Sequence, residues 1–360
     1  MAIDHLEPIT HEALLVRRGR RSGLYTIVAV HSTARGPSLG GCRMWTYADV
    51  RSAMRDALRL SRAMTFKSAV AGLPLGGGKG VICLPAGTAP PAGEARRDVL
   101  LDFGETVEAL DGAYITAEDV GTSEPDMRAI SEVTRHVSGL AVETGGSGDP
   151  SPWTAIGVES AIRVACERVF GSDSVEGRRI AVVGVGHVGR PLAEALARGG
   201  AQLVLADIDA GRRELADRLG AEWTDPETAL RADVDVLAPC ALGGVFDDES
   251  VPQLRCRAIA GAANNQLAAD HVGELLAARG ILWVPDFVAN AGGVVNIAVE
   301  LEPAGYDPAR AETRVRAIAD TVRTVLDHAE ATGTTPLAAA MEIAVRRVEE
   351  AAARPDSAAA

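Results

Sequence analysis

Two lysines in the first third of the chain have surroundings suited to acid–base chemistry. Lys67 lies within residues 65–68, and Lys79 lies within a glycine-rich run over residues 72–80. Glycines let a ligand approach a side chain closely, and two neighbouring lysines lower each other's pKa by like-charge repulsion. One lysine would then hold a substrate carboxylate while the other serves as a base near neutral pH. The competing interpretation is that each lysine is simply a solvated surface residue. Asp119, in the segment 115–122, is a further candidate, and its competing interpretation is an acidic turn.

The glycine run around Lys79 does not match a phosphate-binding loop. The Walker A pattern requires a glycine five residues before the glycine of Gly-Lys, and Ser or Thr after the lysine. Leu73 and Gly80 occupy those two positions. The sequence therefore disfavours a nucleoside triphosphatase.

A second glycine pattern predicts a dinucleotide site. Gly184, Gly186 and Gly189 form GxGxxG together with Val185, His187 and Val188, after an apolar strand at residues 180–183 and before an amphipathic helix. The first glycine permits a tight turn, the second lets a pyrophosphate approach the backbone, and the third lets helix and strand pack closely. The competing interpretation is an ordinary glycine turn.

The identity of the dinucleotide is predicted from an acid. Asp207 ends the next strand, 18 residues after Gly189, where a carboxylate accepts from a ribose 2′-hydroxyl and repels a 2′-phosphate. We therefore predict NAD rather than NADP as the cofactor. Arg212 and Arg213 follow closely enough to weaken this preference, but we expect both on the solvent face of the following helix.

Hydrophobic patterns indicate an α/β protein. The first part of the chain is predicted to contain a hairpin at residues 14–30 and three helices, one from Asp49, one at 99–110 and one capped by Ser123. A Gly/Ser/Pro-rich hinge is predicted after them, at 145–152. A helix at 154–170 follows. Beyond it, short apolar strands alternate with helices, which predicts a parallel sheet covered on both faces. The predicted strands are 180–183, 203–205, 234–237, 258–260 and 281–284, and helices are predicted at 309–331 and 337–353.

Composition limits the partners. The chain of 360 residues is long enough for two domains, and its net charge of −13 argues against nucleic acid and anionic membranes. No apolar run is long enough to span a bilayer, and residues 1–5 lack a secretory signal. Five cysteines without CxxC spacing fit a reduced cytoplasmic protein, and the histidines suggest no metal site.

Several segments, in order along the chain, together resemble the glutamate/leucine/phenylalanine/valine dehydrogenase family, and most closely its leucine dehydrogenases. They are residues 39–47, 65–68, 72–80, 115–122, 149–155, 238–241, 260–266 and 290–294. Cys42 stands where Thr is expected and Ser68 where Asn is usual, and Gly189 completes a fingerprint that many relatives relax. None of these differences removes a catalytic group.

The resemblance implies roles for individual residues. Lys67 would bind the substrate α-carboxylate with help from the backbone at Gly41, Lys79 would be the catalytic lysine, and Asp119 would bind the amine and shuttle protons. Further positions are implied to orient the nicotinamide and the substrate, or to line the side-chain pocket. The first set is Thr154, Ala241, Asn264 and Asn290, with Asn264 also on the substrate side, and the second is Leu39, Ala117, Val294 and Ile297.

The resemblance also implies the architecture and the reaction. Residues 1–148 would form an α/β catalytic domain, against which helices at about 330–353 pack back, and 149–330 a Rossmann-type doubly wound NAD-binding domain, with the active site in the cleft between them. The expected enzyme is a homo-oligomer that reversibly deaminates a branched-chain L-amino acid, using NAD, to a 2-oxo acid and ammonia. The alternatives are a phenylalanine or valine dehydrogenase, or a non-catalytic NAD-binding sensor on the same fold.

Overall fold

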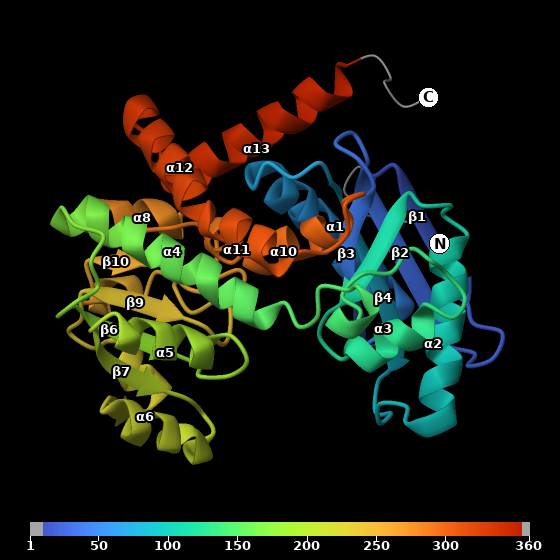
Figure 1. The fold of residues 1–360 in the computed structure, drawn as a ribbon, viewed down its shortest axis with the longest axis horizontal. Helices are drawn as coiled ribbons and strands as arrows, with labels where there is room; N and C mark the ends of the chain where they lie inside the picture. The colour runs from blue at the N-terminus through green and yellow to red at the C-terminus, as the bar shows by residue number, and fades with distance from the viewer. Residues whose placement is uncertain (1–9, 355–360) are drawn as a thin grey trace. The chain divides into compact units, whose positions relative to one another are not determined.

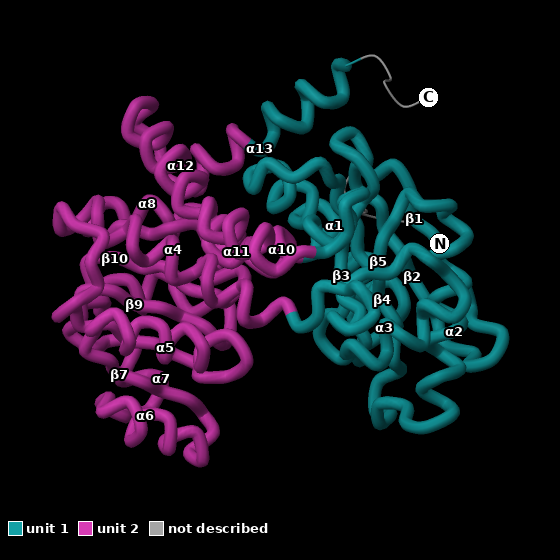
Figure 2. The backbone as a smooth tube through the Cα atoms, viewed as in Figure 1, with its two compact units in different colours: residues 1–149, 297–306, 344–360 teal, residues 150–296, 307–343 magenta. Residues whose placement is uncertain are grey.

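The structure is a computed structural model that describes residues 10–354, in two compact units. Unit 1 comprises residues 1–149, 297–306 and 344–360, and unit 2 comprises 150–296 and 307–343 (Figure 2). The first boundary lies inside the Gly/Ser/Pro-rich segment. Unit 1 also takes in two segments from the last quarter of the chain. Residues 1–5, on which the expectation about a secretory signal rests, lie outside the described residues.

Unit 1 is built on a mixed five-stranded sheet with the order β1-β2-β4-β3-β5 (Figure 1). The predicted hairpin is confirmed, because β1 and β2 pair antiparallel with Ala13 opposite Val30. Strand β2 pairs antiparallel with β4, whereas β4, β3 and β5 run parallel. The strands are β1 (Ala13–Arg18), β2 (Tyr25–Ser32), β3 (Ser38–Tyr47), β4 (Gly76–Pro85) and β5 (Tyr114–Glu118).

Helices cover both faces of this sheet. The predicted helix after Asp49 is α1 (Val50–Val70), and the Asp49 carboxylate accepts from the Ser52 backbone N–H as an N-cap. Helix α1 packs on one face through Ala53 and Ala57, while α2 (Gly93–Glu108) and α3 (Glu124–Ile130) pack on the other. The predicted N-cap of α3 is confirmed at Ser123, whose backbone N–H and hydroxyl both donate to the Asp126 carboxylate.

The glycine run before Lys79 is a buried strand, a structure that the sequence analysis did not assign to it. Gly76, Gly77, Gly78 and Gly80 all lie in β4 and are buried. A Cβ at Gly77 would meet the Thr65 backbone nitrogen at 2.0 Å, and one at Gly78 would meet the Tyr114 ring at 2.5 Å. These glycines therefore let α1 and large side chains pack directly on the strand.

Unit 2 contains a parallel six-stranded sheet with the order β11-β10-β9-β6-β7-β8. Numbered by sequence within the sheet, this is 3-2-1-4-5-6 read from β8, the order of a Rossmann fold. The five predicted strands are confirmed, and short edge strand β8 is additional. The strands are β6 (Arg179–Val183), β7 (Gln202–Ala206), β8 (Glu222–Thr224), β9 (Val236–Pro239), β10 (Ala258–Ile259) and β11 (Leu282–Trp283).

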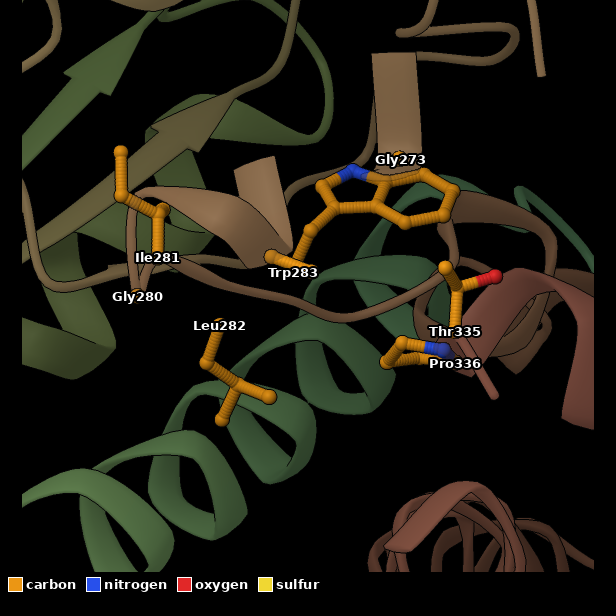
Figure 3. Close-up of a pocket in the computed structure, with 8 residues that line it drawn as sticks. Gly273, Gly280, Ile281, Leu282, Trp283, Thr335 and Pro336 are labelled. Carbon is orange, nitrogen blue, oxygen red and sulfur yellow. The ribbon is translucent and has the colours of Figure 1, made fainter. Parts of the chain in front are cut away.

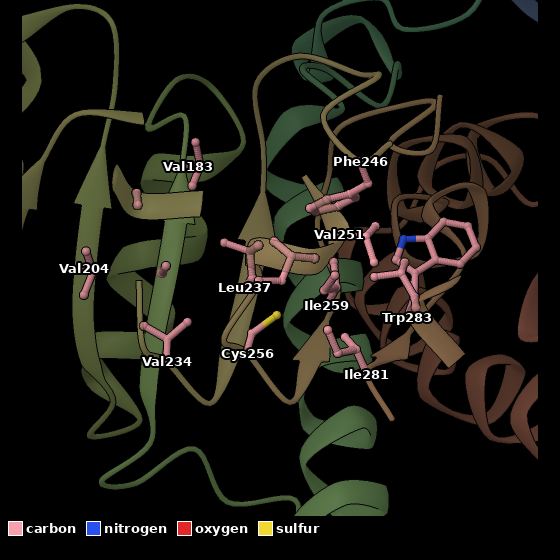
Figure 4. Packing of buried hydrophobic residues seen from close by; sticks show 14 of the residues in the cluster. Val183, Val204, Val234, Leu237, Phe246, Val251, Cys256, Ile259, Ile281 and Trp283 are labelled. Atoms are coloured by element: carbon pink, nitrogen blue, oxygen red, sulfur yellow. The ribbon is translucent and has the colours of Figure 1, made fainter. Parts of the chain in front are cut away.

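The core of unit 2 lies against both faces of this sheet. One cluster joins Val183, Leu237 and Ile259 of the strands to Phe246 and to residues of two helices, α7 and α8 (Figure 4). Helices α4 and α5 pack against the sheet and each other separately. The helices of unit 2 are α4 (Ser151–Phe170), α5 (Gly189–Arg198), α6 (Arg213–Leu219), α7 (Pro226–Leu230), α8 (Val272–Ala278), α9 (Asp286–Ala289), α11 (Pro308–Arg316) and α12 (Ile318–Thr332).

Two helices contain a boundary between the units. In α10 (Gly292–Glu300) the boundary follows Asn296, and in α13 (Pro336–Ala352) it follows Ile343. The Glu300 carboxylate at the end of α10 accepts from the Gly139 and Ser147 backbone N–H groups. The helical pattern at 309–331 is two helices, interrupted at Ala317. Within residues 10–354, no helix is both long and apolar enough to cross a membrane.

Candidate active site

One face of the unit 1 sheet gathers most of the predicted substrate residues. Strands β4, β3 and β5 run parallel and in register, with Leu39 beside Gly77 and Gly41 beside Ala117. Because side chains alternate along a strand, Leu39, Gly41, Lys79 and Ala117 share the face that α1 covers. Lys67 lies in the last turn of that helix. Residues predicted from separate segments are therefore brought together by one sheet face.

Lys79 and Asp119 form an ion pair on this face. The Lys79 ammonium donates from Nζ to Oδ2 of Asp119 over 2.7 Å. Lys79 is only 5% exposed, and burying an ammonium without a carboxylate would cost several kcal/mol. Lys79 thus faces a carboxylate, a contact that the sequence interpretation did not predict.

Arg43 is a second cation on the same carboxylate, and sequence reasoning did not single it out. Its Nε donates to Oδ2 of Asp119 over 3.0 Å, and its Nη1 donates to Asp56 over 3.1 Å. The Tyr47 hydroxyl and Arg59 complete the contacts of Asp56. Arg43 follows Gly41 by two residues in β3, so the period of the strand was the signal that could have identified it.

The charge state of Asp119 follows from these neighbours. Burial by itself would raise the pKa of the Asp119 carboxyl, but Lys79 and Arg43 outweigh burial and hold that pKa below its usual value. Its backbone is fixed as well, since the Asp119 N–H donates to the Thr122 hydroxyl, which donates in turn to the Cys42 carbonyl. Asp119 is therefore a positioned, ionised acceptor.

Gly41 stands where a side chain has no room. A Cβ at this position would lie 2.6 Å from the Glu118 carbonyl oxygen and 2.7 Å from the Asp119 Cβ. Any larger residue would push the end of β5 away from β3 and displace Asp119. The steric requirement explains the glycine without fixing its predicted role near a substrate carboxylate.

The glycine fingerprint of unit 2 has the geometry of a dinucleotide turn. Strand β6 ends at Val183, the turn contains His187 and Val188, and α5 begins at Gly189. Gly184 has φ +98°, a conformation that favours glycine, and a Cβ there would meet the Ala241 Cβ at 2.6 Å. A Cβ at Gly189 would lie 1.8 Å from the Gly184 carbonyl oxygen. These residues fit a nicotinamide dinucleotide.

Asp207 is bonded directly to this turn. Its carboxylate accepts from the Val185 N–H over 2.8 Å and from the Asp209 N–H over 3.0 Å. Burial alone would raise the Asp207 pKa, but those two N–H groups and Arg212 together lower it. Arg212 donates to Asp207 over 2.9 Å, which corrects the expectation of a solvent-facing side chain. Arg213 pairs instead with exposed Asp217.

Two exposed apolar side chains near the fingerprint were missed from the sequence. Ile208 is 92% exposed and Leu242 is 75% exposed. They follow β7 and β9 closely, and these strands flank β6 in the sheet. Ligands of such sheets bind at the carboxyl ends of the strands, where exposed apolar side chains can pack against a ring of the ligand. The signal was their position next to Asp207 and Ala241.

The other polar residues predicted in unit 2 make two separate sets of contacts. The Asn290 amide donates to the Asn264 side-chain oxygen over 2.8 Å and to the Ala262 carbonyl over 3.0 Å. Thr154, in the first turn of α4, donates to the Pro150 carbonyl. A Cβ at Gly293 would lie 3.0 Å from the Thr154 hydroxyl oxygen, so α10 packs closely on α4. The structure thus links Asn264 to Asn290, and Thr154 to the start of α10.

Val294 and Ile297 are buried and lie three residues apart on α10, hence on the same side of the helix. Leu39 and Ala117 of unit 1 are buried too. Burial fits the lining of a pocket as well as the packing of a core.

A cavity of about 270 Å³ lies elsewhere in unit 2, lined by residues around Trp283 and by Thr335 and Pro336 (Figure 3). None of the predicted site residues lines it, so we assign it no part in the reaction.

Comparison with known proteins identifies the family. The model for the Glu/Leu/Phe/Val dehydrogenase dimerisation domain matches residues 11–136, and the Glutamate/Leucine/Phenylalanine/Valine dehydrogenase model matches residues 204–354. The chain belongs to this family. It is an amino-acid dehydrogenase of the NAD(P)-dependent class, so the sequence-based prediction of an enzyme is confirmed.

Individual relatives match over nearly their whole length. The enzyme is 43% identical to leucine dehydrogenase of Thermoactinomyces intermedius, over 96% of this chain and 93% of that one. It is 42% identical to valine dehydrogenase of Streptomyces virginiae, over 96% of each chain. Among solved structures, L-tryptophan dehydrogenase from Nostoc punctiforme superposes with a TM-score of 0.81 at 36% identity, covering 95% of this chain and 97% of that one.

The pKa of Glu118, next to Asp119, makes the stability of the protein pH-dependent. Burial, followed by the charges of Asp149 and Glu124, raises the Glu118 pKa from 4.5 to about 7. Ionising Glu118 is therefore unfavourable in the folded state. Below pH 4.5 Glu118 does not lower the free energy of unfolding, whereas above about pH 7 it lowers it to the full extent.

We predict that Glu118→Gln raises Tm relative to the wild type at about pH 8, by an increment that shrinks toward about pH 5. Thermal unfolding followed by circular dichroism across this range measures it. Glu143→Gln, at an exposed position, removes the same formal charge as a control. A Tm difference for Glu118→Gln that does not change with pH would contradict the assignment.

Proposed function

We propose that this enzyme catalyses the reversible, NAD-dependent oxidative deamination of a branched-chain L-amino acid to its 2-oxo acid and ammonia. Leucine is the proposed main substrate, with valine and isoleucine also accepted. The observation that carries the proposal is the buried Lys79–Asp119 ion pair, on the sheet face covered by α1, the helix whose last turn contains Lys67. Full-length similarity to leucine and valine dehydrogenases supports the reaction type.

The proposed chemistry divides the roles among three side chains. Lys67 holds the substrate α-carboxylate and so fixes the orientation of Cα. Lys79 and Arg43 both contact Oδ2 of Asp119. The proposed acceptor of a hydrogen bond from the substrate amine is therefore Oδ1. Lys79 first gives a proton to Asp119, the carboxylate it bonds to, and as a neutral amine it then takes a proton from the water that adds to Cα. Asp119 passes its proton to the amine and takes the hydroxyl proton as ammonia leaves.

The proposed cofactor is NAD, and the nicotinamide, when bound, accepts the hydride of the substrate Cα. The chain would hold its pyrophosphate at the backbone of Gly184 to Gly189 and its adenosine ribose at Asp207. Asn264, Asn290, Thr154 and Ala241 are proposed contacts of the nicotinamide half, with Asn264 also touching the substrate. These assignments rest on the turn geometry and on the Asn264–Asn290 hydrogen bond.

The proposed side-chain pocket explains the choice of substrate. Leu39, Ala117, Val294 and Ile297 are aliphatic and buried, which suits a branched chain of four or five carbons. A glutamate carboxylate among them would be buried without a partner. Valine or phenylalanine specificity is the alternative, and the resemblance to an L-tryptophan dehydrogenase shows that this fold also occurs with an aromatic substrate. A non-catalytic NAD sensor would not require the Lys79–Asp119 pair.

We also propose that the enzyme is a cytoplasmic homo-oligomer. The model matching residues 11–136 is described as a dimerisation domain, and Trp45 in this segment is more than half exposed. All five cysteines are free thiols in the structure, which suits a reducing compartment. Light scattering on the purified protein gives the subunit number.

Replacing Lys79 with Ala should abolish turnover, by about a thousandfold or more, because the proton transfer loses its base. NADH binding should remain nearly intact, since Lys79 belongs to unit 1 and the glycine fingerprint to unit 2. Steady-state kinetics and an NADH fluorescence titration measure the two effects. Arg20→Ala, which removes an exposed cation, is the control, and near-wild-type kcat in Lys79→Ala would refute the assigned role.

A side-by-side substrate panel tests the proposed pocket. We predict kcat/KM for leucine or valine well above that for phenylalanine, with glutamate inert. Leucine, valine and isoleucine should all react, because one methylene changes discrimination by only about 1–3 kcal/mol. Replacing Leu39 and Ala117 together with smaller residues should shift preference toward phenylalanine. A wild-type enzyme that prefers phenylalanine to every aliphatic substrate would overturn the pocket assignment.

Changing Asp207 to Ala should weaken NADH binding by about 1–3 kcal/mol, because ribose hydroxyls and the Val185 N–H lose their acceptor. The gap between NADH and NADPH should narrow, since a carboxylate no longer repels the 2′-phosphate. Isothermal titration with each coenzyme measures both effects. Unchanged NADH affinity in this variant would show that Asp207 does not contact the ribose.

A further inference from the structure

Arg212 is turned back toward the glycine fingerprint. It ends a short 3₁₀ turn, Ala210–Arg212, that follows β7. Its Nη1 donates to Asp207 over 2.9 Å, and its Nε lies 3.4 Å from the exposed Asp209 carboxylate. Its side chain remains 37% exposed, so the guanidinium is anchored on one edge and accessible on the other.

The guanidinium occupies a specific place above the turn. A Cβ at Gly186 would lie 3.0 Å from the Arg212 Nη1, and the only other atom within 4 Å belongs to the same guanidinium. Gly186 is the position at which a dinucleotide approaches the backbone. Arg212 therefore lies between Gly186 of the fingerprint and Asp207, the two positions proposed to contact the pyrophosphate and the adenosine ribose.

The charges around Asp207 bear on which coenzyme fits. A lone carboxylate at the end of β7 would repel a ribose 2′-phosphate. Here Arg212 neutralises that carboxylate and keeps further N–H donors on its exposed side, since a guanidinium has five. Arginine also matches phosphate oxygens with paired hydrogen bonds, which a carboxylate cannot do. The subsite thus combines an acceptor for ribose hydroxyls with a donor for a phosphate.

We propose that Arg212 is a coenzyme-binding residue of the adenosine subsite, and that it lets this enzyme bind NADP measurably, although less tightly than NAD. This inference rests on the proposed use of a nicotinamide dinucleotide. Asp207 favours the free ribose hydroxyls, while Arg212 donates to the 2′-phosphate and limits the discrimination against it. The Ile208 and Leu242 side chains, exposed on either side of the fingerprint, are available to cover the adenine ring of both coenzymes.

Binding titrations of NADH and NADPH, by calorimetry and coenzyme fluorescence, test this without any measurement of turnover. The variants are Arg212→Met, Arg212→Lys and the matched control Arg213→Met, which removes a neighbouring arginine that pairs only weakly with Asp217. In Arg212→Met, the affinity for NADPH should fall by about tenfold more than the affinity for NADH. Arg212→Lys should recover part of that loss, and Arg213→Met should leave the ratio of the two affinities unchanged.

The double variant Asp207→Ala/Arg212→Met adds a second criterion. Asp207→Ala alone should tighten NADPH binding because Arg212 is released from its carboxylate, and this gain should vanish in the double variant. If Arg212→Met and Arg213→Met give the same ratio of NADPH to NADH affinity, the role of Arg212 is refuted while NAD binding stands. If the wild type binds neither coenzyme, the proposed function fails, and this inference fails with it.

Discussion

A buried ammonium must have a carboxylate beside it, and the organisation of unit 1 follows from that requirement. Lys79 is nearly inaccessible to solvent and bonds to Asp119, whose carboxylate is also held by Arg43. Removing Asp119 would leave the buried Lys79 ammonium without its carboxylate in a low-dielectric environment, which typically costs about 3–5 kcal/mol. The same constraint that stabilises this part of the sheet keeps Asp119 ionised and in place to act on a substrate amine.

The sheet makes this arrangement possible by omitting side chains. Gly41 leaves room for Asp119, and Gly77 lets α1 approach β4 so that the helix end with Lys67 lies over the same sheet face as Lys79. In unit 2, Gly184 and Gly189 close the turn between β6 and α5 in the same way. In both units glycine is needed for close packing of backbone on backbone, and the polar groups are carried by the residues next to it.

Most of the fold could be predicted from hydrophobic period and caps, as Asp49 before α1 and the strands of unit 2 show. It could not be predicted that the glycine run before Lys79 is a strand, because these glycines are needed for packing against Thr65 and Tyr114 from distant segments. The side chain of Arg212 was misplaced for a similar reason, since it turns back to Asp207 and lies near Gly186 of another turn. One signal was available: Lys67 and Lys79 are the only two lysines of the chain, which otherwise uses arginine.

That composition leads to the most direct test of the account. Where only a fixed positive charge is needed arginine suffices, but a guanidinium does not release its proton in proteins, whereas an ammonium can. The decisive measurement is therefore kcat for Lys79→Arg beside Lys67→Arg, with NADH binding as the folding control. The account predicts that Lys79→Arg loses turnover although its charge is kept, while Lys67→Arg retains kcat with a raised KM for the amino acid. Near-wild-type kcat in Lys79→Arg would contradict proton transfer by Lys79.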